Sequence, residues 1–307
     1  MLPWPRLERI LFSPIDMEFF FEIMDNSISK GYCQQSIAYL SQLQKGGNRV
    51  TRLSVNLSML FTEVDFFDRF ERATKAGFKA IEYLFPYSWE VDRLGEQLDR
   101  YDLQQVLFNL PAGNWEAGER GIAALPDRVG EFQDGVGLAI QYAKALKCPR
   151  VNCLVGLTPA GIPEDKVRKT LVENLRFAAK ALSQENIRLL IEALNTRDVP
   201  GFYLSRTVEV ARLIEEINHS NVGYQYDIYH MQIMEGDLTH TIRENLDIIG
   251  HIQLADNPGR HEPGTGEIHF SNLFRFIDEA RYTGWIGCEY KPPGKTEDSL
   301  GWAKPYL

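Results

Sequence analysis

Eight short apolar runs alternate with amphipathic stretches from residue 52 to the end of the chain. Such runs are typical of buried β-strands, and amphipathic stretches between them predict helices. Strands separated by helices form right-handed βαβ units and a parallel sheet. Eight units in roughly 255 residues match the size of a closed (β/α)₈ TIM barrel. The predicted strands are residues 53–57, 80–84, 104–109, 150–154, 188–194, 222–227, 251–255 and 285–290.

Helical stretches between these runs support a single α/β domain. An open doubly wound sheet is the structural alternative. Its best-known dinucleotide signature, GxGxxG directly after the first strand, does not occur here. We therefore predict one TIM-barrel domain over residues 50–307. The clearest helical stretches are residues 65–76, 131–146, 166–183, 206–217 and 273–280.

Residues 1–49 are predicted to be an N-terminal extension, because their pattern is poor. Trp4 lies between two prolines, and a run of three phenylalanines begins at Phe19. The segment either packs on the barrel, is disordered, or reflects a mis-assigned start. The last interpretation is genetic. Lys45-Gly46-Gly47 can be encoded by a sequence like a bacterial ribosome-binding site, and Val50 by the alternative start codon GTG.

Composition narrows the classes of function. The formal net charge is −9, and residues 1–49 carry five basic and five acidic residues, so the excess lies in residues 50–307. An acidic balance argues against a nucleic-acid binder, since phosphate contacts need clustered Lys and Arg. No uncharged apolar run reaches the roughly 18 residues of a membrane span. Four cysteines without a CxxC spacing indicate free thiols in a reducing cytoplasm.

Polar side chains stand at the ends of seven of the predicted strands. In TIM barrels the carboxyl ends of the strands carry the active site. Several carboxylates at one barrel mouth indicate a bound cation, because buried like charges cost several kcal/mol unless they are neutralised. The polar strand-end residues are Asn56, Glu82, Asn109, Glu192, Asp227, Gln253 and Glu289.

The last four of these residues predict a metal site. Glu192, Asp227, Gln253 and Glu289 offer only oxygen ligands. Oxygen ligands suit Mg²⁺ or Mn²⁺, whereas zinc would recruit His or Cys. No organic cofactor is expected. Two glutamates on opposite sides of a chelated hydroxy-carbonyl substrate can move protons between adjacent carbons, which is the logic of aldose–ketose isomerisation.

Further residues are predicted to bind the substrate. His230 follows Asp227 by three residues and either donates to a substrate oxygen or is an ordinary histidine near the surface. His251 shares the face of Gln253 and either supports the ligands or fills the barrel. A substrate carboxylate needs a cationic partner, for which we favour Arg120 and Lys291 over Arg260. The expected substrate-binding residues are His230, Arg120, Lys291, Asn109 and Glu82.

Eight segments of the chain resemble the hydroxypyruvate isomerase family, which belongs to the xylose-isomerase-like barrels. The resemblance covers about residues 51–307. Residues 225–232 (QYDIYHMQ) match the family closely, as do residues 262–268 (EPGTGEI). The others are residues 56–60 (NLSML), 82–87 (EYLFPY), 108–113 (FNLPAG), 117–123 (AGERGIA), 151–156 (VNCLVG) and 287–292 (GCEYKP).

The resemblance implies an intramolecular oxidoreductase that interconverts hydroxypyruvate and 2-hydroxy-3-oxopropanoate (tartronate semialdehyde) in glyoxylate metabolism. It implies metal ligands at Glu192, Asp227, Gln253 and Glu289, and it makes Glu192 and Glu289 the proton donor and acceptor. Members of the family begin a residue or two before Arg52, which favours a mis-assigned start.

Rival functions stay open. A sister group isomerises 2-oxo-tetronates, and Ala193 resembles that group. Sugar 3-epimerases of the superfamily usually have His where Gln253 stands. DNA-repair endonucleases with this barrel bind three metals through many histidines, whereas this chain has six in all. A non-catalytic binding protein would not need four oxygen ligands together with His230. A homo-oligomer is left open.

Overall fold

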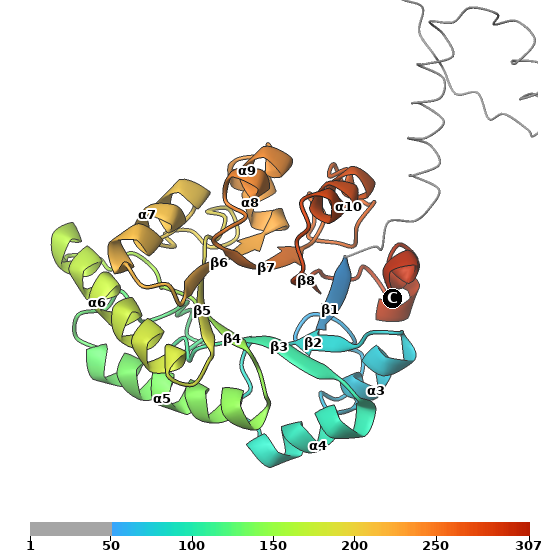
Figure 1. Ribbon diagram of the computed structural model, residues 1–307, viewed down its shortest axis with the longest axis horizontal. Coiled ribbons are helices and arrows are strands. Elements are labelled where there is room, and N and C mark those ends of the chain that lie inside the picture. The colour runs from blue at the N-terminus through green and yellow to red at the C-terminus, as the bar shows by residue number, and fades with distance from the viewer. Residues whose placement is uncertain (1–50) are drawn as a thin grey trace, which may run out of the picture. The chain divides into compact units, whose positions relative to one another are not determined.

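Residues 51–307 are described by a computed structural model and form a closed barrel of eight parallel strands. Each strand pairs with the next in sequence, and β8 pairs with β1 to close the ring. Figure 1 shows the strands as an inner ring with the helices around it. The predicted (β/α)₈ fold is confirmed. The predictions for residues 1–49 lie outside the described residues.

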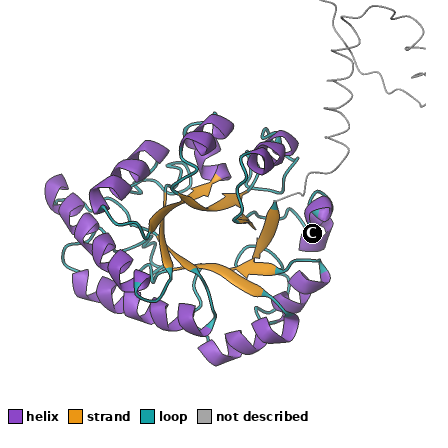
Figure 2. Ribbon diagram, in the orientation of Figure 1, coloured by secondary structure: helices purple, strands orange, loops and turns teal. Residues whose placement is uncertain are grey.

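Each strand is followed by at least one helix or 3₁₀ turn (Figure 2). The strands are β1 (Arg52–Asn56), β2 (Ala80–Glu82), β3 (Gln104–Asn109), β4 (Arg150–Cys153), β5 (Arg188–Glu192), β6 (Val222–Asp227), β7 (Ile249–Leu254) and β8 (Trp285–Cys288). The α-helices are α3 (Asp68–Lys75), α4 (Val91–Tyr101), α5 (Val129–Ala145), α6 (Glu164–Ser183), α7 (Thr207–Ile217), α8 (Ile228–Met234), α9 (Leu238–Glu244) and α10 (Phe270–Glu279). Two 3₁₀ turns follow, η1 (Thr296–Leu300) and η2 (Lys304–Tyr306).

Several strands end earlier than their apolar runs predict. The run at 188–194 is a strand only to Glu192, where the pairing of β5 with β6 ends at Gln225. Glu289 lies one residue beyond β8, but its backbone N–H still donates to the Leu254 carbonyl at 3.0 Å. Apolar side chains continue past the strands because the first loop residues are also buried. The site residues therefore stand on or directly beside the rigid barrel.

The barrel interior holds both apolar and polar side chains. On β5, Leu190 and Glu192 share the inward face, because successive side chains alternate across a strand. Leu190 belongs to a small apolar cluster with Ala80 and Val106, against which Trp285 packs. A much larger apolar cluster extends over the rest of the domain.

None of the helices in residues 51–307 has the length and apolar character that a membrane span requires.

Candidate active site

Asp227 is both the last residue of β6 and the N-cap of α8. Its Oδ1 accepts hydrogen bonds from the backbone N–H groups of Tyr229 at 2.8 Å and His230 at 3.4 Å. A strand that runs directly into a helix leaves these N–H groups without intrahelical partners, and a capping carboxylate satisfies them. Asp227 Oδ2 is buried and has no hydrogen-bond partner in the described part of the chain. One oxygen is thus held by the backbone, and the other is left for a cation or a substrate.

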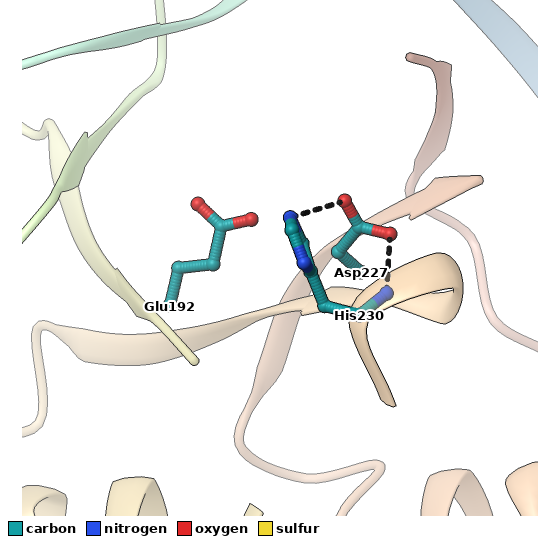
Figure 3. Close-up of side chains that lie close together, drawn as sticks. All are labelled: Glu192, Asp227 and His230. Atoms are coloured by element: carbon teal, nitrogen blue, oxygen red, sulfur yellow. Dashed lines mark hydrogen bonds and ion pairs between the residues drawn. The ribbon is translucent and has the colours of Figure 1, made fainter. Parts of the chain in front are cut away.

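Three buried side chains meet at the end of β5 and β6. Single oxygen or nitrogen atoms of Glu192, Asp227 and His230 all lie within 4.8 Å of one another. Figure 3 shows the three side chains turned toward one another. Asn152 on β4 donates to Glu192 Oε2 at 2.9 Å and to Asn109 Oδ1 at 3.1 Å. The predicted ligands Glu192 and Asp227 are therefore neighbours, as their positions on adjacent strands require.

The geometry of His230 fixes its tautomer. The backbone N–H of Asn195 donates to His230 Nδ1 at 3.1 Å, so Nδ1 is the unprotonated nitrogen. The neutral ring then carries its proton on Nε2, which lies 3.5 Å from Asp227 Oδ2. Burial and the nearby Arg260 guanidinium hold the pKa of His230 well below its usual value. His230 is thus a neutral hydrogen-bond donor at the site and offers no lone pair on Nε2.

Arg260 is the cation that the loop after β7 brings to the carboxylates. Its Nη2 lies 2.5 Å from Glu289 Oε1 and 3.6 Å from Asp227 Oδ2. Its guanidinium also lies 5.1 Å from the centroid of the Tyr229 ring. The loop is held by Asp256, whose buried carboxylate accepts from the backbone N–H groups of residues 257, 264, 266 and 268. The structure therefore places Arg260 in the site.

The other two predicted cations lie elsewhere. Arg120 donates to the backbone carbonyls of Trp115 and Glu119, and its guanidinium stands 4.0 Å from the centroid of the Trp115 ring. The Lys291 side chain is exposed, and its backbone N–H donates to the Arg260 carbonyl. No contact within residues 51–307 joins either side chain to the carboxylates. Their role in substrate binding stays a prediction.

Glu82 and Gln253 lie side by side with Glu289. Gln253 Nε2 donates to Glu82 Oε1 at 2.7 Å and also to Glu289 Oε2. His251 contacts Glu82 Oε2 at 2.9 Å. Burial alone would raise the pKa of Glu82, but His251, Gln253 and Ser54 hold it below its usual value. Glu82 is therefore an ionised carboxylate that is surrounded by donors.

Sequence reasoning missed Asn152, for which the available signal is a polar residue within an apolar run. Asn152 lies one residue before the end of β4, and its side chain contacts both Glu192 and Asn109. The apolar run continues through Leu154, so Asn152 stands inside the run and not at its end. The sequence does not favour Arg260 over Arg120 and Lys291, because spacing alone does not show which loop cation turns inward.

The carboxylates carry more negative charge than the protein neutralises. Burial, then the charges of Glu289 and Asp227, raise the pKa of Glu192 well above its usual value. Burial raises the pKa of Asp227 despite Arg260. Burial together with neighbouring carboxylates raises the pKa of Glu289 to about 8, although Arg260 opposes the shift. Three carboxylates facing one guanidinium, with Asp227 Oδ2 unbonded, fit a divalent cation that accepts oxygen ligands.

Comparison with known proteins gives the family. Residues 70–306 match the model of the xylose isomerase-like TIM barrels. The chain is 53% identical over 255 residues to the hydroxypyruvate isomerase of Escherichia coli K12, with 83% of this chain and 99% of that protein covered. The chain belongs to the hydroxypyruvate isomerase family. It is therefore an isomerase.

Other relatives in the wider barrel family carry different names. The 2-oxo-tetronate isomerase of Cupriavidus necator is 44% identical over 256 residues, which cover 83% of this chain and 98% of that protein. A crystal structure titled AP endonuclease, family 2, from Brucella melitensis superposes with a TM-score of 0.82 at 44% identity. That alignment covers 83% of this chain and 99% of the other. The family thus includes two named isomerase activities.

The raised carboxylate pKa values predict how stability depends on pH. Without a divalent ion, folded Glu192 and Glu289 hold protons at a pH where the unfolded chain has lost them. Unfolding then releases protons, so the free energy of unfolding should fall from pH 7 to pH 8. His230, with a lowered pKa, costs stability only below about pH 6.5. Urea unfolding in chelator at both pH values measures the slope.

The Glu289→Gln variant is the control for this slope. It removes the carboxyl group whose pKa is raised to about 8, so the fall in stability between pH 7 and pH 8 should become smaller. A wild-type protein whose stability is constant or rises over this interval would contradict the assignment of raised pKa values.

Proposed function

We propose that this isomerase interconverts hydroxypyruvate and 2-hydroxy-3-oxopropanoate with a bound Mg²⁺ or Mn²⁺. The observation that carries the proposal is the buried cluster of Glu192, Asp227 and Glu289, beside which the described residues place one cationic side chain, that of Arg260. The identity of 53% to a hydroxypyruvate isomerase supports the choice of substrate. The residues that would hold the ion are Glu192, Asp227, Gln253 and Glu289.

The reaction moves one proton between carbons and one between oxygens. A glutamate takes a proton from C3 of hydroxypyruvate, and a glutamate returns one to C2, so that the CH₂OH group becomes an aldehyde and the ketone a hydroxyl. Glu192 and Glu289 are the proposed pair, because both are buried and carry raised pKa values. A bound divalent ion would polarise the carbonyl and stabilise the negative charge that develops on the substrate oxygens.

Two further groups have positions that suit this reaction. His230 presents an Nε2–H toward the carboxylates and can donate a hydrogen bond to a substrate oxygen, as its tautomer requires. Arg260 presents a guanidinium beside Glu289, and its planar fork suits a substrate carboxylate. Since its Nε is buried without a hydrogen-bond partner among the described residues, Arg260 has donor capacity left for a ligand.

The second candidate is isomerisation of a 2-oxo-tetronate. The 44% identity to the Cupriavidus necator protein and Ala193 favour it. NMR with Mg²⁺ present can follow both products, which are the aldehyde 2-hydroxy-3-oxopropanoate from hydroxypyruvate and the 3-oxo ketone from the 2-oxo-tetronate. We expect a higher kcat/KM for hydroxypyruvate. A higher kcat/KM for the 2-oxo-tetronate would transfer the same chemistry to the longer substrate, and no turnover of either would refute both proposals.

Removal of the ion should destabilise the fold and stop turnover. A ligand that binds only the native state at 100 times its Kd adds about 2.7 kcal/mol to the free energy of unfolding. We expect EDTA to lower the Tm, and Mg²⁺ or Mn²⁺ to restore both Tm and activity. Full activity and an unchanged Tm in metal-free buffer would contradict the metal site.

A further inference from the structure

Glu82 is buried with every lone pair direction occupied. Oε2 accepts from Ser54 Oγ at 2.9 Å and from His251 at 2.9 Å. Oε1 accepts from Gln253 Nε2 at 2.7 Å and from Asn56 Nδ2 at 3.4 Å. The side chain has no exposed surface. With both oxygens engaged and no exposed surface, Glu82 is not positioned to contact a substrate directly.

The packing around Glu82 depends on a glycine of β8. A Cβ atom at Gly287 on β8 would lie 2.4 Å from both carboxylate oxygens. Only glycine at this position admits the carboxylate, because real Cβ atoms do not approach so closely. Because Gly287 on β8 has no side chain, the barrel interior has room for the Glu82 carboxylate.

Two of the four donors connect Glu82 to Glu289. Asn56 Nδ2 donates to Glu289 Oε2 at 2.9 Å, and Gln253 Nε2 donates to the same oxygen. A carboxamide nitrogen has two hydrogens, so each amide bridges Glu82 and Glu289. Each nitrogen must then face the two carboxylates. The oxygen of Gln253 accepts from Gln225 Nε2 at 2.6 Å, a hydrogen bond that it would exchange for the ion in the proposed metal site.

We propose that Glu82 is a positioning residue that fixes the orientation of the Asn56 and Gln253 amides, and through them the place of Glu289. A flipped amide would direct its oxygen at two carboxylates and withdraw a donor from Glu289. This inference rests on the proposed function, since it assigns a purpose to the orientation of Gln253 and Glu289 in the metal site.

His251 holds Glu82 from the opposite side. Arg150 Nη1 lies 3.5 Å from His251 Nδ1, and a guanidinium can only donate. Nδ1 is therefore the acceptor, and Nε2–H donates to Glu82 Oε2. A hydrogen-bonded chain thus runs from Arg150 at the start of β4 to Glu289 at the end of β8. We infer that His251 holds the Glu82 carboxylate in place, and that Glu82 in turn holds the amides of Asn56 and Gln253.

The test compares Glu82→Gln with wild type. The variant keeps the shape but replaces one acceptor oxygen with an NH₂ group, which must face two donors. Loss of such supporting hydrogen bonds typically costs about 10- to 100-fold in metal affinity or activity. We expect the Kd for Mn²⁺, measured by calorimetry, to rise by this factor and kcat to fall, while KM for hydroxypyruvate changes little.

Three further variants distinguish a positioning role of Glu82 from a general loss of structure. Asp278→Asn is an isosteric control, because Asp278 accepts from Thr51 far from the site, and its Mn²⁺ affinity should equal wild type. His251→Leu removes one donor to Glu82 and should weaken Mn²⁺ binding. His251→Gln places an amide N–H near the position of Nε2 and should restore most of it. If Glu82→Gln does not fold, Mn²⁺ binding by His251→Leu and His251→Gln still tests the positioning role of Glu82.

Failure of the proposed isomerase function and failure of the positioning role of Glu82 give different results. Wild-type protein that neither binds Mn²⁺ nor isomerises hydroxypyruvate would refute the proposed function. Wild-type protein that does both, with equal Kd and kcat in Glu82→Gln, would overturn only the role of Glu82. Equal Mn²⁺ binding in wild type, His251→Leu and His251→Gln would also overturn it.

Discussion

The Glu289→Gln and Glu192→Gln variants should each lower kcat by at least ~100-fold, the lower range for a lost general base. Glutamine keeps the shape and one ligating oxygen but cannot take a proton. Because the ligand set is otherwise intact, both variants should retain part of their affinity for Mg²⁺. Steady-state kinetics at saturating Mg²⁺, beside calorimetry of Mg²⁺ binding, measures both effects.

Asp227→Asn and Gln253→Glu are the matched comparison. These residues are proposed to hold the ion without moving a proton, so their losses should appear mainly as weaker metal binding, and excess Mg²⁺ should rescue activity. If excess metal instead returns both glutamate variants to near-normal kcat, Glu192 and Glu289 only hold the ion. Another group, with His230 the first candidate, would then move the proton.

Replacing Arg260 should have the next largest effect on catalysis. A hydrogen bond to a charged group contributes about 1.5–3 kcal/mol, and each ~1.4 kcal/mol is tenfold. We therefore expect Arg260→Met to lower kcat/KM by roughly 10- to 100-fold. Arg260→Lys keeps the charge but not the planar fork, so it should recover only part of the loss. Michaelis kinetics with hydroxypyruvate test both variants.

Arg120 and Lys291 provide the control for Arg260. Arg120→Ala and Lys291→Ala remove the cations that were favoured from the sequence but that lie apart from the carboxylates. Geometry predicts smaller changes in kcat/KM for both than for Arg260→Met. A larger effect of either variant would show that the substrate carboxylate binds outside the position of Arg260. Arg260 would then serve only as a counter-ion for Asp227 and Glu289.

The barrel could be predicted because its signal is repeated eight times. Each strand is buried on both sides and reads as an apolar run, so errors of one or two residues at the ends do not change the fold. The predicted strand at 251–255 starts two residues after β7 does, at Ile249, and this error does not change the position of Gln253 at the mouth. Closure of the ring follows from eight units of the right length.

The site could be predicted only where a strand places the side chain. Glu192 and Asp227 sit on adjacent strands, so their approach follows from the sheet. Arg260 sits on a loop, and its direction depends on four backbone hydrogen bonds to Asp256, which no periodicity reveals. Glu82 has the same strand-end pattern as Glu192. Its different surroundings arise from contacts with His251 and Gly287 on other strands.

Solvent deuterium incorporation tests the central account most directly. Hydroxypyruvate is incubated in D₂O with protein and Mg²⁺, and deuterium at C3 of the recovered substrate and C2 of the product is measured by NMR. The account predicts deuterium at both carbons with wild type and Mg²⁺, and rates at least ~100-fold lower with Glu289→Gln. Full turnover without deuterium at C2 of the product would mean that the same hydrogen moves from C3 to C2, directly or on one shielded base, and would contradict the account in which Glu192 and Glu289 act as a pair.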